Sequence, residues 1–98
     1  MRLITEKAVE HFLNAKSFNQ SNTQIKVLPN VTIMLLFGNK IAYKYNDPEQ
    51  TMSITNAGYK TNVTKERLNG LSNVHIVQKN GTWFLNGQEW DGNLIDVK

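Results

Sequence analysis

Cysteine is absent from this sequence of 98 residues. The chain therefore cannot form disulfide bonds, and thiolate ligands are excluded from any metal site. A protein without cysteine is compatible with a reducing compartment, where disulfides do not persist. This absence favours the cytoplasm as the place where the protein acts.

Long apolar segments are missing as well. The longest uninterrupted apolar run extends from Ile33 to Phe37, whereas a membrane-spanning helix needs roughly 20 such residues. The segment from Met1 to Glu6 has neither the apolar stretch nor the small-residue cleavage site of a secretory signal. We therefore expect no membrane association and no export by the secretory route.

Residue types that serve catalysis are scarce. His11 and His75 are the two histidines, and neither belongs to a known catalytic pattern with a serine or a carboxylate. They also lack the i, i+4 spacing of a helical zinc pair. The glycines occur singly and form no phosphate-binding pattern. We therefore predict that the protein is not an enzyme and uses no metal or cofactor.

The apolar content of 40% is sufficient for one hydrophobic core, and the length matches a single domain over residues 1–98. A domain this small gains from oligomerisation, because it buries a limited share of its surface. The net charge of +3 and the pI near 9.3 are mildly basic, which permits weak attraction to nucleic acid or another anionic partner.

The sequence begins with a pattern typical of an amphipathic helix, which we expect from Glu6 to Lys16. Ala8 and Phe12 recur on one face at helical spacing. Thr5 is the expected N-cap. The polar stretch over residues 17–23 has no periodicity and is predicted to be a connecting loop.

A period of two then predicts an antiparallel meander of about four strands, over residues 24–28, 31–37, 40–45 and 51–55. The second strand is apolar on both faces, so we place it in the middle of the sheet, with a helix or a second copy of the chain covering its other side. We expect Gly38-Asn39 to form the two-residue turn that follows it.

The last third of the chain favours a short second helix and a β-hairpin, which makes the fold class α+β. The helix is expected to begin at Thr64 and to end at Gly70. The hairpin is expected over residues 74–78 and 82–85, followed by a turn at Asn86-Gly87 and a terminal strand over residues 94–97. Trp83 and Leu85 should face the core, with Phe84 on the opposite side.

Basic residues near aromatic ones suggest a nucleic-acid-binding module as one hypothesis. Lys40 and Lys44 flank Tyr43, while Lys65, Arg67 and Lys79 occur around the short helix. Lysines that keep sheet edges soluble explain the same pattern equally well.

The C-terminal half resembles a family of small tailed-phage proteins of unassigned function. The resemblance depends on a T-x-x-R-L-N helix, from Thr64 to Asn69, and on a Q-K-x-G-x-W-x-L-N-G hairpin, from Gln78 to Gly87. It implies a phage origin and action in the cytoplasm of the host cell. Small phage accessory proteins often bind and block a host enzyme or defence complex, which implies an anti-defence or anti-CRISPR inhibitor.

The hypothesis of a blocking protein requires a binding surface, for which the sequence offers eight candidates. The partner is expected to be a host protein or protein complex, with nucleic acid and a second copy of the chain as alternatives. Arg67 and Asn69 have a second interpretation, which we favour, namely that they tie the short helix to neighbouring loops. The candidate binding residues are Lys40, Tyr43, Lys44, Lys65, Arg67, Asn69, Lys79 and Phe84.

Overall fold

The computed structural model describes residues 2–97 and confirms the α+β class. Two helices and nine strands follow one another along this part of the chain. The helices are α1 (Leu3–Leu13) and α2 (Asn62–Leu68). The strands are β1 (Phe18–Gln20), β2 (Thr23–Val27), β3 (Val31–Leu36), β4 (Asn39–Tyr45), β5 (Met52–Ile54), β6 (Ile76–Lys79), β7 (Thr82–Leu85), β8 (Gln88–Glu89) and β9 (Ile95–Val97).

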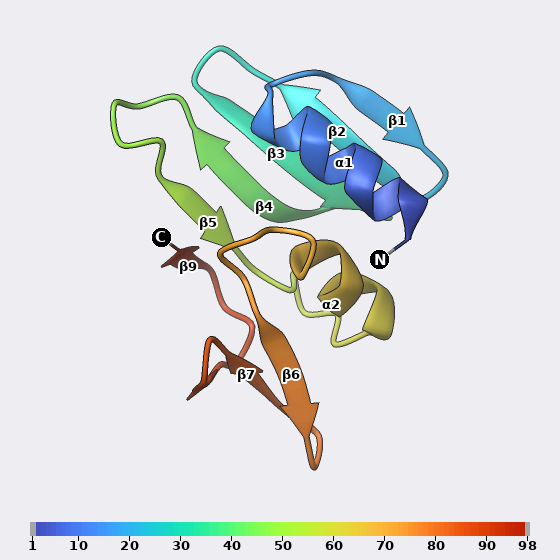
Figure 1. Ribbon diagram of the computed structural model, residues 1–98, viewed down its shortest axis with the longest axis vertical. Coiled ribbons are helices and arrows are strands. Elements are labelled where there is room, and N and C mark those ends of the chain that lie inside the picture. Colours follow the sequence, from blue (N-terminus) through green and yellow to red (C-terminus); the bar gives the residue numbers. More distant parts are fainter. Residues whose placement is uncertain (1, 98) are drawn as a thin grey trace.

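The larger sheet is antiparallel and has the strand order β1-β2-β3-β4-β5-β9. Its strands β2 to β5 confirm the predicted meander, and β9 confirms the predicted terminal strand. Figure 1 shows α1 lying across one face of this sheet, with α2 and the smaller sheet beside it. The prediction of a loop over residues 17–23 is wrong in part, because Phe18 to Gln20 pair with β2 as an edge strand.

Strand β3 occupies a central position between β2 and β4, as predicted. Met34 and Leu36 belong to the same core cluster as Ala8 and Phe12 of α1. Side chains alternate along a strand, so Ile33 and Leu35 point to the opposite face. Both are nevertheless buried; their cross-strand partners have long side chains, Lys26 and Tyr43 for Ile33 and Gln24 and Lys40 for Leu35. Coverage of that face by a second copy stays a prediction.

Helix α1 begins earlier than the sequence pattern suggested, and the prediction of Thr5 as its N-cap is wrong. The N-cap is Arg2, and its side chain makes no capping hydrogen bond. Thr5 lies in the first turn and is buried. Its hydroxyl donates a hydrogen bond to Glu66 and accepts one from Arg67, so this threonine connects α1 to α2.

Helix α2 also begins before the predicted start at Thr64. Its N-cap is Thr61, whose hydroxyl oxygen accepts a hydrogen bond from the backbone N–H of Thr64 at 3.1 Å. Thr64 is itself buried, and its hydroxyl lies 2.9 Å from that of Thr61. The helix ends at Leu68, before the predicted end at Gly70, and Asn69 is the C-cap.

The smaller sheet has the strand order β6-β7-β8 and contains the predicted hairpin. Its two turns are Asn80-Gly81 and Asn86-Gly87, and all four residues have positive φ, as a two-residue hairpin turn demands. Trp83 is buried in the core, as predicted. One core cluster contains side chains from α1, α2 and both sheets, among them Phe12, Leu68, Trp83, Leu85 and Val97.

Candidate functional site

The structure separates the candidate residues of the meander onto two faces of the larger sheet. Lys40 pairs with Leu35 and Tyr43 pairs with Ile33, so both lie on the face away from α1. Lys44 pairs with Thr32 and therefore lies on the other face. These three candidates do not share one surface.

Arg67 is only 1% exposed, and its guanidinium is fully engaged inside the protein. Nε donates to the hydroxyl of Thr23 at 3.0 Å, and Nη1 donates to the hydroxyl of Thr5 at 2.7 Å. Nη1 also forms an ion pair with Glu66, and Nη2 lies 3.3 Å from Oδ1 of Asn22. The arginine thus joins α2 to α1 and β2, and it presents no charge to a partner.

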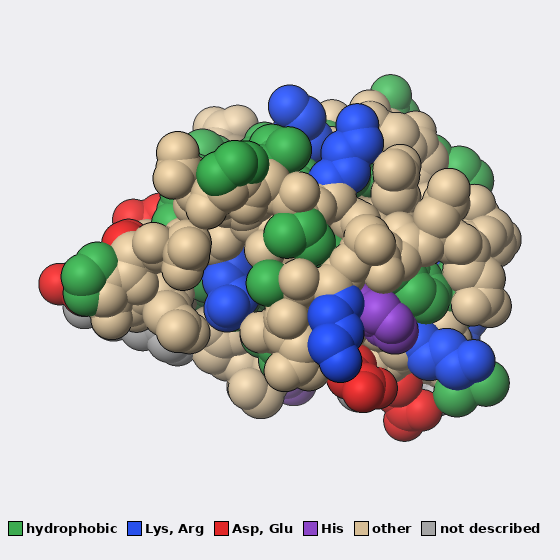
Figure 2. Space-filling model, turned by 90° about the horizontal axis from the view of Figure 1, so that it is seen from above, with side chains coloured by type: hydrophobic (Ala, Val, Ile, Leu, Met, Phe, Trp, Pro, Cys, Tyr) green, Lys and Arg blue, Asp and Glu red, His purple; other side chains and the backbone are tan. Residues whose placement is uncertain are grey.

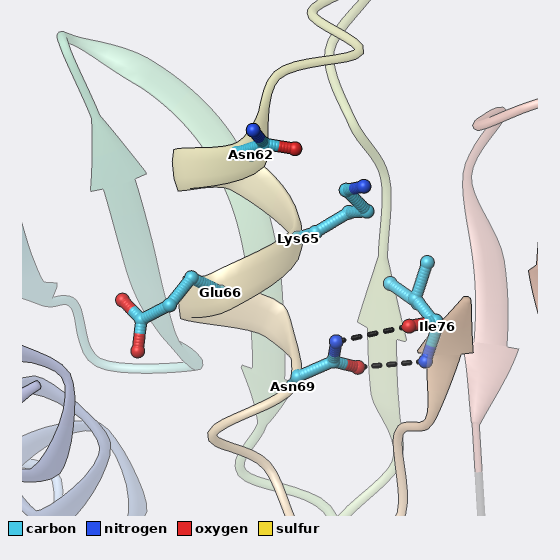
Figure 3. Close-up of a pocket in the computed structure, with 5 residues that line it drawn as sticks. All are labelled: Asn62, Lys65, Glu66, Asn69 and Ile76. Carbon is cyan, nitrogen blue, oxygen red and sulfur yellow. Dashed lines mark hydrogen bonds between the residues drawn. The ribbon is translucent and has the colours of Figure 1, made fainter. Parts of the chain in front are cut away.

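Asn69 also serves the fold, as Figure 3 shows. Its Nδ2 donates to the carbonyl oxygen of Ile76 at 3.0 Å, and its Oδ1 accepts from the N–H of Ile76 at 2.6 Å. The side-chain amide therefore replaces a neighbouring strand at the outer edge of β6. The contacts of Arg67 and Asn69 support the interpretation that both residues tie α2 to neighbouring segments.

Lys65 and Glu66 point in opposite directions from α2 at the hollow shown in Figure 3. Nζ of Lys65 donates to Oε1 of Gln78 at 2.7 Å and lies 5.8 Å from the ring centroid of Trp83. Three of the four polar side chains around this hollow, those of Lys65, Glu66 and Asn69, are thus already paired with other parts of the chain. It is a weak candidate for a binding site.

Lys79 and Phe84 complete the predicted set. Lys79 is exposed at the end of β6, and Phe84 is half-buried opposite Val77. In the view of Figure 2, lysine and arginine side chains lie apart from one another among neutral and apolar ones, while acidic side chains gather at one end and along the lower edge. The basic residues on this face form no continuous patch.

A different feature stands out at the turn between β3 and β4. Leu36 pairs with Asn39, so the two turn residues are Phe37 and Gly38, and the predicted turn at Gly38-Asn39 is wrong by one residue. Both turn residues have positive φ, 52° for Phe37 and 79° for Gly38. Phe37 is also 69% exposed, the highest value among the large apolar side chains in the described part of the chain.

Phenylalanine is an unfavourable residue for this backbone position. A left-handed conformation costs a residue with a bulky side chain roughly 1–2 kcal/mol, and asparagine or aspartate is preferred before glycine in such turns. The chain itself follows this preference in the smaller sheet, where Asn80 and Asn86 precede glycine with φ near 50°. An exposed aromatic side chain is thus held in a conformation that disfavours it, which is typical of a functional position.

A pocket of about 250 Å³ lies next to Phe37, between the β3-β4 turn and the start of α2. Tyr59, which is 53% exposed, stands at the same pocket. It follows a second turn of the same kind, in which Ala57 and Gly58 have positive φ and the N–H of Tyr59 bonds to the carbonyl of Asn56 at 2.8 Å. Two exposed aromatic side chains therefore line one small pocket.

A second, shallower hollow of about 420 Å³ adjoins Phe37 on the side of β1 and β2. We call the residues that line the two hollows the Phe37 surface. None of them is charged, although charged residues make up 19% of the sequence. The Phe37 surface comprises Asn19, Ser21, Asn22, Thr23, Gln24, Leu36, Phe37, Gly38, Asn39, Ile41, Asn56, Tyr59, Thr61 and Thr64.

Sequence reasoning missed this surface because it searched for basic and catalytic residue types. The signal that identifies it is the dipeptide Phe37-Gly38 between two strands, in a chain that uses Asn-Gly at two comparable turns. The partner aromatic, Tyr59, is distant in sequence and could be found only from the fold. Lys40, which belongs to the predicted set, lies in β4 between Asn39 and Ile41 of this surface but lines neither hollow.

Phe37→Asn is expected to increase the free energy of unfolding by about 1 kcal/mol, because asparagine tolerates the left-handed conformation better than phenylalanine. The exposed phenylalanine ring contributes little packing that could offset this gain. Urea denaturation measures the change. The matched control is Asn80→Phe, which places phenylalanine at the equivalent turn position with φ 51° and should lower stability by a similar amount. A Phe37→Asn protein less stable than the wild type would contradict the assignment of strain.

The described residues contain neither a metal-binding cluster nor a helix suited to crossing a membrane. No three His, Asp or Glu side chains among residues 2–97 gather closely enough to hold an ion. Both helices in this part of the chain are too short, and insufficiently apolar, to span a bilayer.

Comparison with known proteins identifies the family to which this chain belongs. The sequence matches the family model described as Kyanoviridae Gp96 protein over residues 1–96. No curated protein and no solved structure matches the chain. The match includes α1 and the meander, which the resemblance to tailed-phage proteins did not cover, and it confirms that resemblance at the level of a phage family. The chain therefore belongs to the Kyanoviridae Gp96 family of phage proteins.

Proposed function

We propose that this phage protein is a non-enzymatic accessory protein that binds and blocks a host macromolecule through the Phe37 surface. The observation that carries the proposal is the exposed ring of Phe37 at a turn position where asparagine would stabilise the fold. Strained backbone positions cluster at functional sites, and a large, exposed aromatic side chain is the residue type that contributes most to binding energy at interfaces.

The composition of the Phe37 surface supports a protein partner. The cores of protein interfaces are depleted in charged residues and enriched in aromatic ones, and binding energy concentrates in a few large side chains near the centre. The Phe37 surface has no charged residue, and Phe37 and Tyr59 are its two aromatic residues. Both aromatic side chains are accessible without any rearrangement of the fold.

The more specific form of the proposal concerns the target. A small phage protein that presents a binding surface acts by occlusion, which requires no catalytic group of its own. A host protein or protein complex is the proposed partner, and inhibition of a defence complex, as in an anti-CRISPR protein, is the proposed outcome. Action in the host cytoplasm belongs to the same proposal.

Affinity capture tests this function directly. The full chain carrying a tag, the Phe37→Asn variant and a Leu94→Ser variant are each incubated with lysate of the phage host. Leu94 is 58% exposed and lines neither hollow of the Phe37 surface, so Leu94→Ser controls for loss of an exposed apolar side chain. We expect a host protein that the wild type and Leu94→Ser recover equally and that Phe37→Asn recovers at least tenfold less. Recovery that is the same for all three chains would refute the proposal.

A second candidate function, binding of single-stranded nucleic acid, is favoured by the sheet face away from α1. The rings of Tyr43 and Tyr45 lie 6.3 Å apart and nearly parallel, at 8°. Lys26 pairs with Ile33, which lies beside Tyr43, and Lys40 pairs with Leu35 on the same face. Aromatic rings that stack on bases beside lysines that contact phosphates form a known type of nucleic-acid surface.

This alternative is tested by fluorescence anisotropy of a labelled single-stranded oligonucleotide. The nucleic-acid hypothesis predicts binding that weakens steeply with added salt and that Tyr43→Ser reduces, while Phe37→Asn leaves it unchanged. Absence of binding at low salt would eliminate this candidate and leave the blocking function unaffected.

A further inference from the structure

The pocket beside Phe37 is too small for most metabolites and cofactors. Its volume of about 250 Å³ lies below the roughly 300–1,000 Å³ that is typical of small-molecule sites. Leu36 and Ile41, both buried, belong to its lining, while Phe37 and Tyr59 are exposed beside it. A single large side chain of a partner fits a pocket of this size.

The lining excludes a charged occupant. An ionised group that enters a pocket loses hydration, and this loss must be offset by a counter-charge or by several hydrogen bonds. The pocket is lined by Leu36, Phe37, Asn39, Ile41, Asn56, Tyr59, Thr61 and Thr64, none of which carries a charge near pH 7. An acidic, basic or phosphorylated side chain would therefore be disfavoured.

Three of the polar side chains that line the pocket, those of Asn56, Thr61 and Thr64, already make hydrogen bonds within the fold. The hydroxyl of Thr61 caps α2 and bonds to the hydroxyl of Thr64. Oδ1 of Asn56 accepts the N–H of Gly58 at 2.8 Å. A nucleobase presents several donors and acceptors that need partners when they are buried, and the side chains of Tyr59 and Asn39 offer too few additional groups to pair with all of them. An apolar side chain makes no such demand.

From size, charge and hydrogen bonding together we infer that the pocket receives one uncharged apolar side chain, aromatic or large aliphatic, from a polypeptide partner. This inference rests on the proposed function and specifies the chemistry of its partner. Phe37 and Tyr59 contact the inserted side chain from the two sides of the pocket, and Leu36 and Ile41 pack against it.

The neighbouring hollow supplies contacts for the rest of the partner segment. Asn19 and Gln24 lie opposite each other on β1 and β2, on the other side of Phe37 from the pocket. A side-chain amide both donates and accepts hydrogen bonds, which matches the N–H and C=O groups of a peptide main chain. The segment that binds therefore has its apolar side chain in the pocket and its backbone over these amides.

The experiment that tests the inference uses small probes and needs no knowledge of the natural partner. Backbone amide chemical shifts of the full chain are followed by NMR during titration with N-acetyl-phenylalaninamide, N-acetyl-lysinamide and adenosine. We expect N-acetyl-phenylalaninamide to shift the amides of Phe37, Gly38 and Tyr59, with half-saturation on the order of 1 mM, as its size allows. N-acetyl-lysinamide and adenosine should bind at least tenfold more weakly.

Variants show whether those shifts arise in the pocket. Phe37→Asn and Tyr59→Ser should each weaken the binding of N-acetyl-phenylalaninamide several-fold, whereas Leu94→Ser should leave it unchanged. Stronger binding of adenosine or of the lysine probe, or the absence of shifts with every probe, would overturn the inference.

The outcome also separates this inference from the proposed function. Shifts confined to the pocket without capture of a host protein would uphold the pocket and refute the blocking function. Capture of a host protein that depends on Phe37, without any chemical-shift change from the probes, would uphold the blocking function and refute the inference about the pocket.

Discussion

Arg67→Met is expected to lower the free energy of unfolding by about 2–4 kcal/mol, because it removes a buried guanidinium and leaves its hydrogen-bond partners unsatisfied, while its ion-pair partner Glu66 keeps some contact with water. The substitution leaves Glu66 without its ion-pair partner and leaves the hydroxyls of Thr5 and Thr23 without their donor. A domain of this size has a total stability of roughly 5–15 kcal/mol. Urea denaturation should therefore show a large fall in the urea concentration at the midpoint of unfolding. If the loss approaches the total stability, the variant will be unfolded at room temperature.

Lys65→Met is the matched control for that experiment. It removes a positive charge from the same helix, but the amino group of Lys65 has one exposed hydrogen bond, to Gln78, and a contact with the ring of Trp83. Exposed pairs of this kind contribute about 0.2–1 kcal/mol. Equal effects of the two substitutions would contradict the buried network that joins α2 to α1 and β2.

Gly92→Ala is the second substitution from which we expect a large loss, about 2–5 kcal/mol. Gly92 has φ +90°, which is costly for alanine, and a Cβ at this position would lie 2.0 Å from Nδ2 of Asn56. The carbonyl of Gly92 also accepts hydrogen bonds from the N–H of Asn56 and the hydroxyl of Thr55. Crowding in a packed region adds about 1–3 kcal/mol to the backbone cost.

Gly87→Ala separates the cost of the positive φ from the cost of crowding by Asn56. Its φ of +89° is nearly the same, but a Cβ there would meet no atom within 4 Å. We expect about 1–2 kcal/mol of destabilisation from the backbone alone, measured by the same denaturation experiment. If Gly87→Ala were as harmful as Gly92→Ala, the close approach of Gly92 to Asn56 would have no energetic consequence.

Much of the fold followed from local patterns in the sequence. The alternation over residues 24–55 predicted four adjacent strands, and the two Asn-Gly dipeptides predicted the turns of the smaller sheet, because both signals depend on the residues themselves. Helix starts were predicted less well. Thr5 and Thr64 suit an N-cap by residue type, yet both are buried inside their helices; Thr5 bonds to Glu66 of α2, and Thr64 bonds to Thr61, the residue that caps α2.

The role of Arg67 could not be derived locally, because its contact with Thr5 depends on how α1 and α2 meet. The pairing of Phe18 with Ile25 is local, but β1 has only three residues, two of them polar, and gives no alternating pattern in the sequence. The T-x-x-R-L-N pattern therefore describes a structural element in this protein, since its arginine and asparagine both bond within the chain. The basic residues predicted from the sequence lie on several faces, because the fold decides which face of the protein each side chain occupies.

The candidate site illustrates a different limit of prediction from sequence. Its signal is an aromatic residue in a turn that disfavours it, and this becomes apparent only when the register of β3 and β4 identifies Phe37 as a turn residue. The second aromatic, Tyr59, and the uncharged lining come from segments that are far apart in sequence. Only the folded chain brings them together.

Phe37 is expected to touch the partner itself, and photo-crosslinking from this position detects such a contact. The photoreactive phenylalanine analogue p-benzoylphenylalanine replaces Phe37 in one full-length chain and Leu94 in another, and both are irradiated in lysate of infected host cells. We predict a covalent adduct between position 37 and one defined protein, and no such adduct from position 94. Equal labelling from the two positions, or none from position 37, would contradict the claim that Phe37 is a binding residue.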